Sequence, residues 1–129
     1  MKKYTNYHRH SKYSNIATID CTLTVHDYVR RALELGHTSI STVEHGYHGG
    51  MTSILEAYEA CQKNGLKLLV GAEAYFVEDR FEKDKTNYHI VIMALNHKGL
   101  KQLNLALSEA NMTGYYYKAR LDFDIISKL

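Results

Sequence analysis

Short β-branched segments alternate with amphipathic, helix-like segments along almost the whole chain, and the connections between them are short. Residues 4–8, 38–43, 66–77 and 88–95 are predicted to form strands, and residues 25–35, 51–64 and 98–111 to form helices. Such alternation favours a mainly parallel α/β sheet. The segment 66–77 is either one strand or a pair broken near Gly71. The segment 88–95 is nearly continuously apolar, as expected of a strand buried on both faces.

Apolar residues recur at helical spacing in each predicted helix, and they predict which face is buried. The buried faces are expected to carry the following residues: Val25, Tyr28, Val29, Ala32 and Leu33; then Met51, Ile54, Leu55, Tyr58 and Cys61; and last Leu100, Leu103, Leu107 and Ala110. Thr24 and Asp27 resemble a capping box at the first helix. Gly36, Gly65 and Gly114 are the expected stops, and Asp122 or Asp124 is a candidate cap for a final helix.

Composition excludes several classes of protein. Apolar residues make up 45% of the 129 residues and charged residues 23%, which is typical of one globular domain and not of a disordered chain. The chain is too short for a full eight-unit barrel, which takes about 250 residues. The net charge of +2 neither requires nor excludes nucleic acid. Cys21 and Cys61 form no CxxC pattern, which favours a cytoplasmic location. The N-terminal residues are polar, so no secretory signal is expected. The sequence contains no long apolar run, so no membrane span is expected.

Several imidazoles and carboxylates lie where a parallel sheet collects its functional groups. His8 and His10 lie two apart in an extended segment, so both side chains point the same way. Glu44 and His45 follow a predicted strand, and strand carboxyl ends carry the sites of such folds. Glu73 lies in an otherwise apolar strand, where an unpaired carboxylate is costly. Each also has an ordinary interpretation: an exposed histidine, a solvated loop, an outward-facing edge position.

Two further candidates are weaker when taken alone. His89 opens the apolar run at 88–95, where a lone histidine is more often a hydrogen-bonded core residue. Asp20 is equally well explained as a turn-forming aspartate. Together, however, six of these residues offer only nitrogen and oxygen donors, which suits Zn, Mn or Fe: His8, His10, Asp20, His45, Glu73 and His89. Six donors exceed one tetrahedral site, so two or more divalent ions are expected, in the arrangement used for displacement at phosphorus.

Four motifs, in order along the chain, resemble those of the PHP family, named for polymerase and histidinol phosphatase. They are His8-Arg9-His10-Ser11 followed by Tyr13-Ser14, then Glu44-His45-Gly46, Gly71-Ala72-Glu73-Ala74-Tyr75 and Tyr88-His89-Ile90-Val91. The stretch Tyr116-Tyr117-Lys118-Ala119-Arg120-Leu121-Asp122 is similar to the form of this domain at the start of the bacterial DNA polymerase III alpha subunit. Glu44 replaces the family's usual aspartate, and Cys21 its usual glycine.

The resemblance implies a fold, a ligand set and two to three divalent metal ions. The fold would be part of a distorted (β/α)7 barrel, with residues 1–129 forming the N-terminal part of the domain, before the family's last ligand motifs. The implied metal ligands are His8, His10, Asp20, His45, Glu73 and His89, with Glu73 bridging two ions and with His45 and Asp20 also serving catalysis. Lys118 and Arg120 would face phosphate or nucleic acid, or else pack against another part of the protein. His26, His37, His48 and His97 are expected at the surface, with His48 nearest the site.

Three functions follow from these residues and from the resemblance. The leading hypothesis is metal-dependent hydrolysis of a phosphoester at a nucleic-acid end, as in the 3′–5′ exonuclease activity of some replicative polymerases. The second is a non-catalytic module that braces polymerase segments further along the chain. The third is a small-molecule phosphatase similar to histidinol phosphatase. Self-association through exposed strand edges is also expected.

Overall fold

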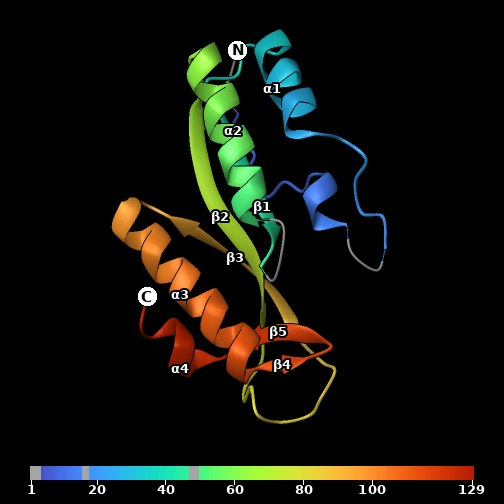
Figure 1. Ribbon diagram of the computed structural model, residues 1–129, viewed down its shortest axis with the longest axis vertical. Helices are drawn as coiled ribbons and strands as arrows, with labels where there is room; N and C mark the ends of the chain where they lie inside the picture. Colours follow the sequence, from blue (N-terminus) through green and yellow to red (C-terminus); the bar gives the residue numbers. More distant parts are fainter. Residues whose placement is uncertain (1–3, 16–17, 47–49) are drawn as a thin grey trace.

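The computed structural model describes residues 4–15, 18–46 and 50–129 (Figure 1). Its elements, in chain order, are a short 3-10 turn η1 (Lys12–Ser14), α1 (Val25–Glu34), β1 (Ser39–His45), α2 (Gly50–Asn64), β2 (Lys67–Phe76), β3 (Tyr88–Ala94), α3 (His97–Thr113), β4 (Tyr115–Tyr116), β5 (Lys118–Leu121) and α4 (Phe123–Ile126). The three predicted helices and the short last helix are confirmed. The strand predicted at 4–8 is wrong, because this segment bends at Tyr7 and pairs with no strand in the described part of the chain.

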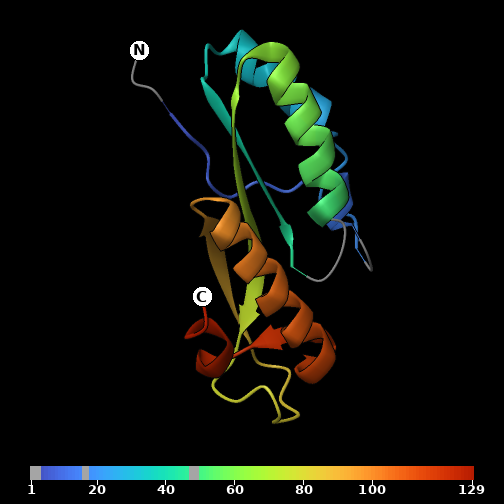
Figure 2. The ribbon, with the colours of Figure 1, turned by 60° about the vertical axis from the view of Figure 1, so that its left-hand side comes forward.

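Strand β2 organises the sheet and runs nearly the length of the molecule (Figures 1 and 2). Its first seven residues pair in parallel with β1, and Val70–Phe76 pair antiparallel with β3 on the opposite edge. β5 then pairs in parallel with Tyr75 and Phe76, and β4 pairs antiparallel with β5. The sheet is therefore mixed, and a mainly parallel sheet was only partly the right expectation. Over the described ranges the strands do not close into a barrel.

The two faces of the sheet differ in what covers them. Side chains alternate along β2, so Ala72 and Ala74 point to one face while Glu73 and Tyr75 point to the other. On the first face, α1 and α2 cover the start of the sheet and α3 and α4 cover its end (Figure 2). The strand registers pair His45 with Glu73 and Tyr75 with His89, which places these four side chains together on the second face.

Local signals in the sequence set the helix ends as expected. Thr24 and Asp27 form the predicted capping box at α1, and Asp122 caps α4. Gly36 and Gly65 follow α1 and α2 with φ of 69° and 66°, a backbone region that glycine adopts without strain. None of the helices in the described part of the chain is long and apolar enough to cross a membrane.

The predicted burial of two segments is wrong. Strand β3 is half-exposed rather than buried on both faces, because it pairs only with β2. On α2, Met51, Leu55 and Tyr58 are exposed. Of the predicted face, Cys61 is buried and Ile54 is half-buried. The small side chains Ser53, Ala57 and Ala60 are buried in place of the others, because they allow the helix to approach the sheet closely. The spacing of apolar residues correctly predicted that α2 is a helix, but it did not predict which face of the helix packs against the sheet.

Strand β2 is continuous through Gly71, where the sequence had left open a break. A Cβ atom at this position would lie 2.5 Å from the carbonyl oxygen of Ile92 and 3.3 Å from Val43. Glycine is needed here because the neighbouring strands approach the β2 backbone closely. The residue therefore keeps the strand intact and does not end it.

Two buried arginines hold the last strands and helix of the chain against β2 and the segment that follows it. Arg80 donates to Asp122 at 2.7 and 2.8 Å, which ties the segment after β2 to the start of α4. Arg120 donates to four main-chain carbonyls, those of Arg80, Glu82, Asp84 and Gly114, at 2.7 to 3.0 Å. The β4–β5 hairpin, which the sequence did not predict, is thereby held against the end of β2.

Candidate metal centre

Glu73 lies at the centre of a cluster of histidines on the second face of the sheet. Its side chain is only 3% exposed. Oε2 lies 2.5 Å from His8 Nε2 and 3.1 Å from His10 Nε2, and these two imidazole nitrogens lie 2.9 Å apart. Oε1 faces the other way, 3.2 Å from His45 Nδ1 and 3.0 Å from His89 Nδ1. One buried carboxylate therefore presents each of its oxygens to a different pair of imidazoles.

The segment before η1 brings His8 and His10 to this cluster. It runs beside β1, and the main-chain oxygen of Arg9 accepts a hydrogen bond from Val43 N at 3.2 Å. Because side chains alternate in an extended segment, Arg9 points away from its two neighbours. Its Nε donates to the Ser41 carbonyl at 2.6 Å, and its guanidinium packs 4.3 Å from the ring of Tyr28. The buried arginine thus fixes the side of the segment that both histidines face.

Asp20 and Tyr75 complete the surroundings of His45. Asp20 Oδ2 lies 2.8 Å from His45 Nε2, and the Tyr75 hydroxyl lies 2.6 Å from His45 Nδ1. The ring of Tyr75 also meets the ring of His89 edge-on, with centroids 5.0 Å apart. The structure therefore brings all six predicted ligands into one cluster, with Asp20 at its exposed margin.

Glu44 is not part of this cluster, and its role was missed in the sequence. It is 2% exposed and accepts four hydrogen bonds: from Ser11 N, Ser11 Oγ, Ser14 Oγ and Ser53 Oγ, at 2.5 to 2.9 Å. The burial of the Glu44 carboxylate would raise its pKa, but these donors outweigh burial and lower the net pKa. The Ser11-x-x-Ser14 spacing after the histidine pair was the available signal.

Ser14 connects Glu44 to one of the clustered histidines. Its hydroxyl donates to Glu44 Oε2 and lies 2.7 Å from His10 Nδ1. Because the serine proton is engaged by the carboxylate, His10 Nδ1 must donate to Ser14 Oγ. The tautomer that results leaves the lone pair on His10 Nε2, the atom that faces Glu73. Glu44 thus orients a candidate ligand without touching the cluster.

The protonation states suit cation binding. Burial and the neighbouring His45 lower the pKa of His10, which keeps its ring neutral at pH 7. Burial would raise the pKa of Glu73, but His89, His10 and His45 lower it further than burial raises it, so the carboxylate is ionised. Moreover, Glu73 Oε1 is buried and accepts no hydrogen bond from any residue that the structure describes. An ionised, under-satisfied carboxylate among imidazole nitrogens is a donor set that fits divalent Zn, Mn or Fe.

The two predicted phosphate-binding residues have different surroundings in the structure. Lys118 Nζ lies 4.0 Å from the centroid of the Tyr75 ring, on the cluster side of the sheet. Arg120 is 2% exposed and its guanidinium is engaged by main-chain carbonyls, so we assign it to packing. His26 and His97 are exposed and His37 is half-buried, away from the cluster, while His48 lies outside the described residues. Cys21 and Cys61 are free thiols.

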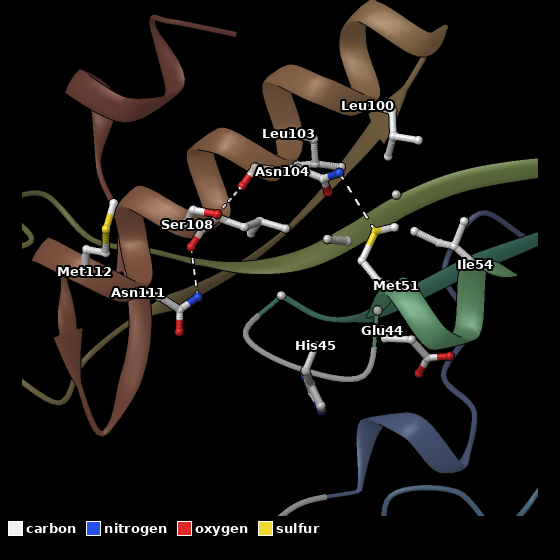
Figure 3. A pocket seen from close by; sticks show the side chains of 15 residues that line it. Glu44, His45, Met51, Ile54, Leu100, Leu103, Asn104, Ser108, Asn111 and Met112 are labelled. Carbon is white, nitrogen blue, oxygen red and sulfur yellow. Dashed lines mark hydrogen bonds between the residues drawn. The ribbon is translucent and has the colours of Figure 1, made fainter.

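A sizeable cleft lies apart from the centre of the histidine cluster. It has a volume of about 660 Å³ and lies between α2 and α3 on the helix-covered face, lined by Met51, Ile54, Leu103 and Leu107 among others (Figure 3). The ring of His45 points away from this cleft. The cleft has an apolar lining and no cluster of donors, so size alone does not identify the site.

Comparison with known proteins gives consistent results. The chain is 29% identical to DNA polymerase III subunit alpha of Aquifex aeolicus over 98% of its own length, and 29% identical to the same subunit of Treponema pallidum over 97%. It spans only 11% of the length of each of these relatives. A solved structure from Bifidobacterium adolescentis, described as a metal-dependent phosphoesterase, matches 87% of this chain and 34% of its own, with a TM-score of 0.56 and 19% identity. That likeness shows the fold.

A family model also matches nearly the whole chain. The model of the PHP domain matches residues 6–129, which include every histidine and carboxylate of the cluster. The match agrees with the order of the four motifs in the sequence. The chain belongs to the PHP domain family.

Proposed function

We propose that this chain carries a divalent-metal centre that hydrolyses phosphoester bonds, with a nucleic-acid end as the substrate. The observation that carries the proposal is the buried Glu73 carboxylate, whose two oxygens face two separate pairs of imidazoles. Such a divided arrangement suits two ions that share one carboxylate. A bound pair of divalent ions would stabilise negative charge at the phosphoryl group and lower the pKa of a water molecule.

The protein's own residues would then divide the remaining tasks. His8, His10, His45 and His89 would hold the ions together with Glu73. His45 and Asp20, 2.8 Å apart, form a pair that can hold a proton at the exposed margin of the cluster. Lys118 supplies a cation beside Tyr75, where it can attract a substrate phosphate. Arg120 is left out of the site.

Hydrolysis of model substrates tests this proposal. With Mn²⁺ or Zn²⁺ added, the chain should release nucleotides from the 3′ end of a single-stranded oligonucleotide, and Glu73→Gln should abolish the release. The matched control is Glu59→Gln, an exposed carboxylate on α2, which should retain full activity. A chain that binds the metals but hydrolyses none of a panel of phosphoesters would instead be a structural module. Preferential release of phosphate from small monoesters would indicate a small-molecule phosphatase.

A further inference from the structure

A tyrosine in an unusual backbone conformation lies at the turn between β4 and β5. Tyr117 has φ of 61°, the one positive φ outside glycine among the described residues. Glycine would adopt this conformation without strain, whereas a side chain at positive φ is disfavoured. The ring is 64% exposed, so it does not contribute to the core. Burial therefore does not explain why an aromatic residue occupies this turn, and strained positions of this kind often serve function.

The surroundings of Tyr117 combine aromatic rings with lysines. Lys85 Nζ lies 4.3 Å from the centroid of its ring, and Tyr116 packs against its edge with centroids 4.8 Å apart. Lys118, the next residue, places its own ammonium over Tyr75. Exposed aromatic rings interleaved with cations are the surface on which unpaired bases stack while their phosphates are neutralised.

This surface adjoins the histidine cluster. Tyr116 and Lys118 are directly paired across the hairpin, so their side chains point to the same face of the sheet. Lys118 contacts Tyr75, and Tyr75 contacts both His45 and His89. A strand whose last base lies on Tyr117 would therefore have its phosphate near Lys118 and the cluster.

We propose that Tyr117, with Lys85 and Lys118, forms a stacking subsite for the unpaired end of a single-stranded nucleic acid. The inference rests on the proposed function and deepens it, since it selects a nucleotide strand over a small phosphomonoester as substrate. Tyr117 is a specificity residue in this account, and it holds neither metal nor reacting atoms.

Binding of a short fluorescein-labelled oligothymidylate, followed by anisotropy with metals chelated, tests the subsite. Tyr117→Gly should weaken binding about 5- to 100-fold, the range for loss of one stacked base. It should not lower the thermal midpoint, because glycine suits the positive φ. Tyr117→Phe should bind like the wild type, since the ring is kept. Tyr115→Gly is the matched control: Tyr115 is 61% exposed, but it pairs with Ala119 and so lies on the opposite face.

The subsite would be refuted if Tyr117→Gly bound the oligonucleotide as tightly as the wild type, if Tyr115→Gly weakened binding equally, or if the wild type did not bind it. Release of phosphate from glycerol 2-phosphate with Mn²⁺ separates the two proposals. The subsite predicts that Tyr117→Gly leaves this reaction unchanged, because this small ester carries no aromatic ring to stack. A wild-type chain that binds the oligonucleotide but never hydrolyses an ester would overturn the proposed function and leave the subsite standing.

Discussion

Replacing Glu44 by glutamine should destabilise the protein, although the two side chains have nearly the same shape. The carboxylate is buried and accepts hydrogen bonds on both oxygens: from Ser11 N and Ser14 Oγ on Oε2, and from Ser11 Oγ and Ser53 Oγ on Oε1. A glutamine amide keeps one acceptor oxygen and puts a donor in place of the other. Whichever way the amide turns, two donors face its NH₂ group.

The size of the effect follows from these contacts. A hydrogen bond to a charged group contributes about 1.5–3 kcal/mol and a neutral one about 0.5–1.5 kcal/mol. Turning the amide so that its oxygen replaces Oε2 keeps Ser11 N and Ser14 Oγ paired, at the strength of neutral bonds. The other two hydroxyls must reorient, and Ser53 Oγ has Thr42 Oγ1 at 2.6 Å as an alternative partner. The neutral amide is less costly to bury than the carboxylate, which offsets part of this effect. We therefore expect the free energy of unfolding to fall by about 2–4 kcal/mol.

Urea unfolding of Glu44→Gln at pH 7 measures this loss, with Glu59→Gln as the control. The exposed control should change the free energy of unfolding by less than about 0.5 kcal/mol. Because the pKa of Glu44 is lowered in the folded protein, its stabilisation is fully present above the unfolded pKa of about 4.3. It is lost as the pH falls through the folded pKa, so the two curves should converge in acid. A Glu44→Gln protein as stable as Glu59→Gln at pH 7 would refute the reasoning.

Two further substitutions test the local structure. Thr24→Ala removes half of the capping box of α1 and should cost about 1 kcal/mol in urea unfolding, whereas Thr22→Ala, at an exposed position before the cap, should cost almost nothing. Gly114→Ala should cost about 1–3 kcal/mol, because its Cβ would lie 2.1 Å from the main-chain oxygen of Arg120. Gly50→Ala, where a Cβ meets nothing within 4 Å, is the comparison, and equal effects at the two glycines would contradict the packing described here.

Much of the fold could be predicted because its signals are local. Caps such as Thr24 and Asp122, and the glycines after α1 and α2, act through their own neighbours in the chain. The alternation of strands and helices likewise needs no knowledge of distant contacts. What could not be predicted depends on partners far apart in sequence: the antiparallel pairing of β3 with β2, and the burial of Ala57 and Ala60 on α2 instead of Leu55 and Tyr58.

The candidate site shows the same division. The histidines and Glu73 were found because an imidazole pair and a carboxylate in an apolar strand are chemically unusual, and the family motifs placed them in order. The network around Glu44 was missed, because serines at 11, 14 and 53 attract no notice until the fold brings them to one carboxylate. For Arg120 the sequence left open a phosphate contact or packing, and only the fold shows that carbonyls surround its charge.

Metal binding to the whole chain tests the central claim most directly. Protein stripped with a chelator and then titrated with Mn²⁺ or Zn²⁺ in a calorimeter should bind more than one ion per chain. Replacing an outer partner of a metal site usually lowers the metal affinity about 10- to 100-fold. Glu73→Gln should lower it by at least as much, because this residue lies at the centre of the cluster. Saturable binding that Glu73→Gln leaves unchanged, or no binding by the wild type, would contradict the account.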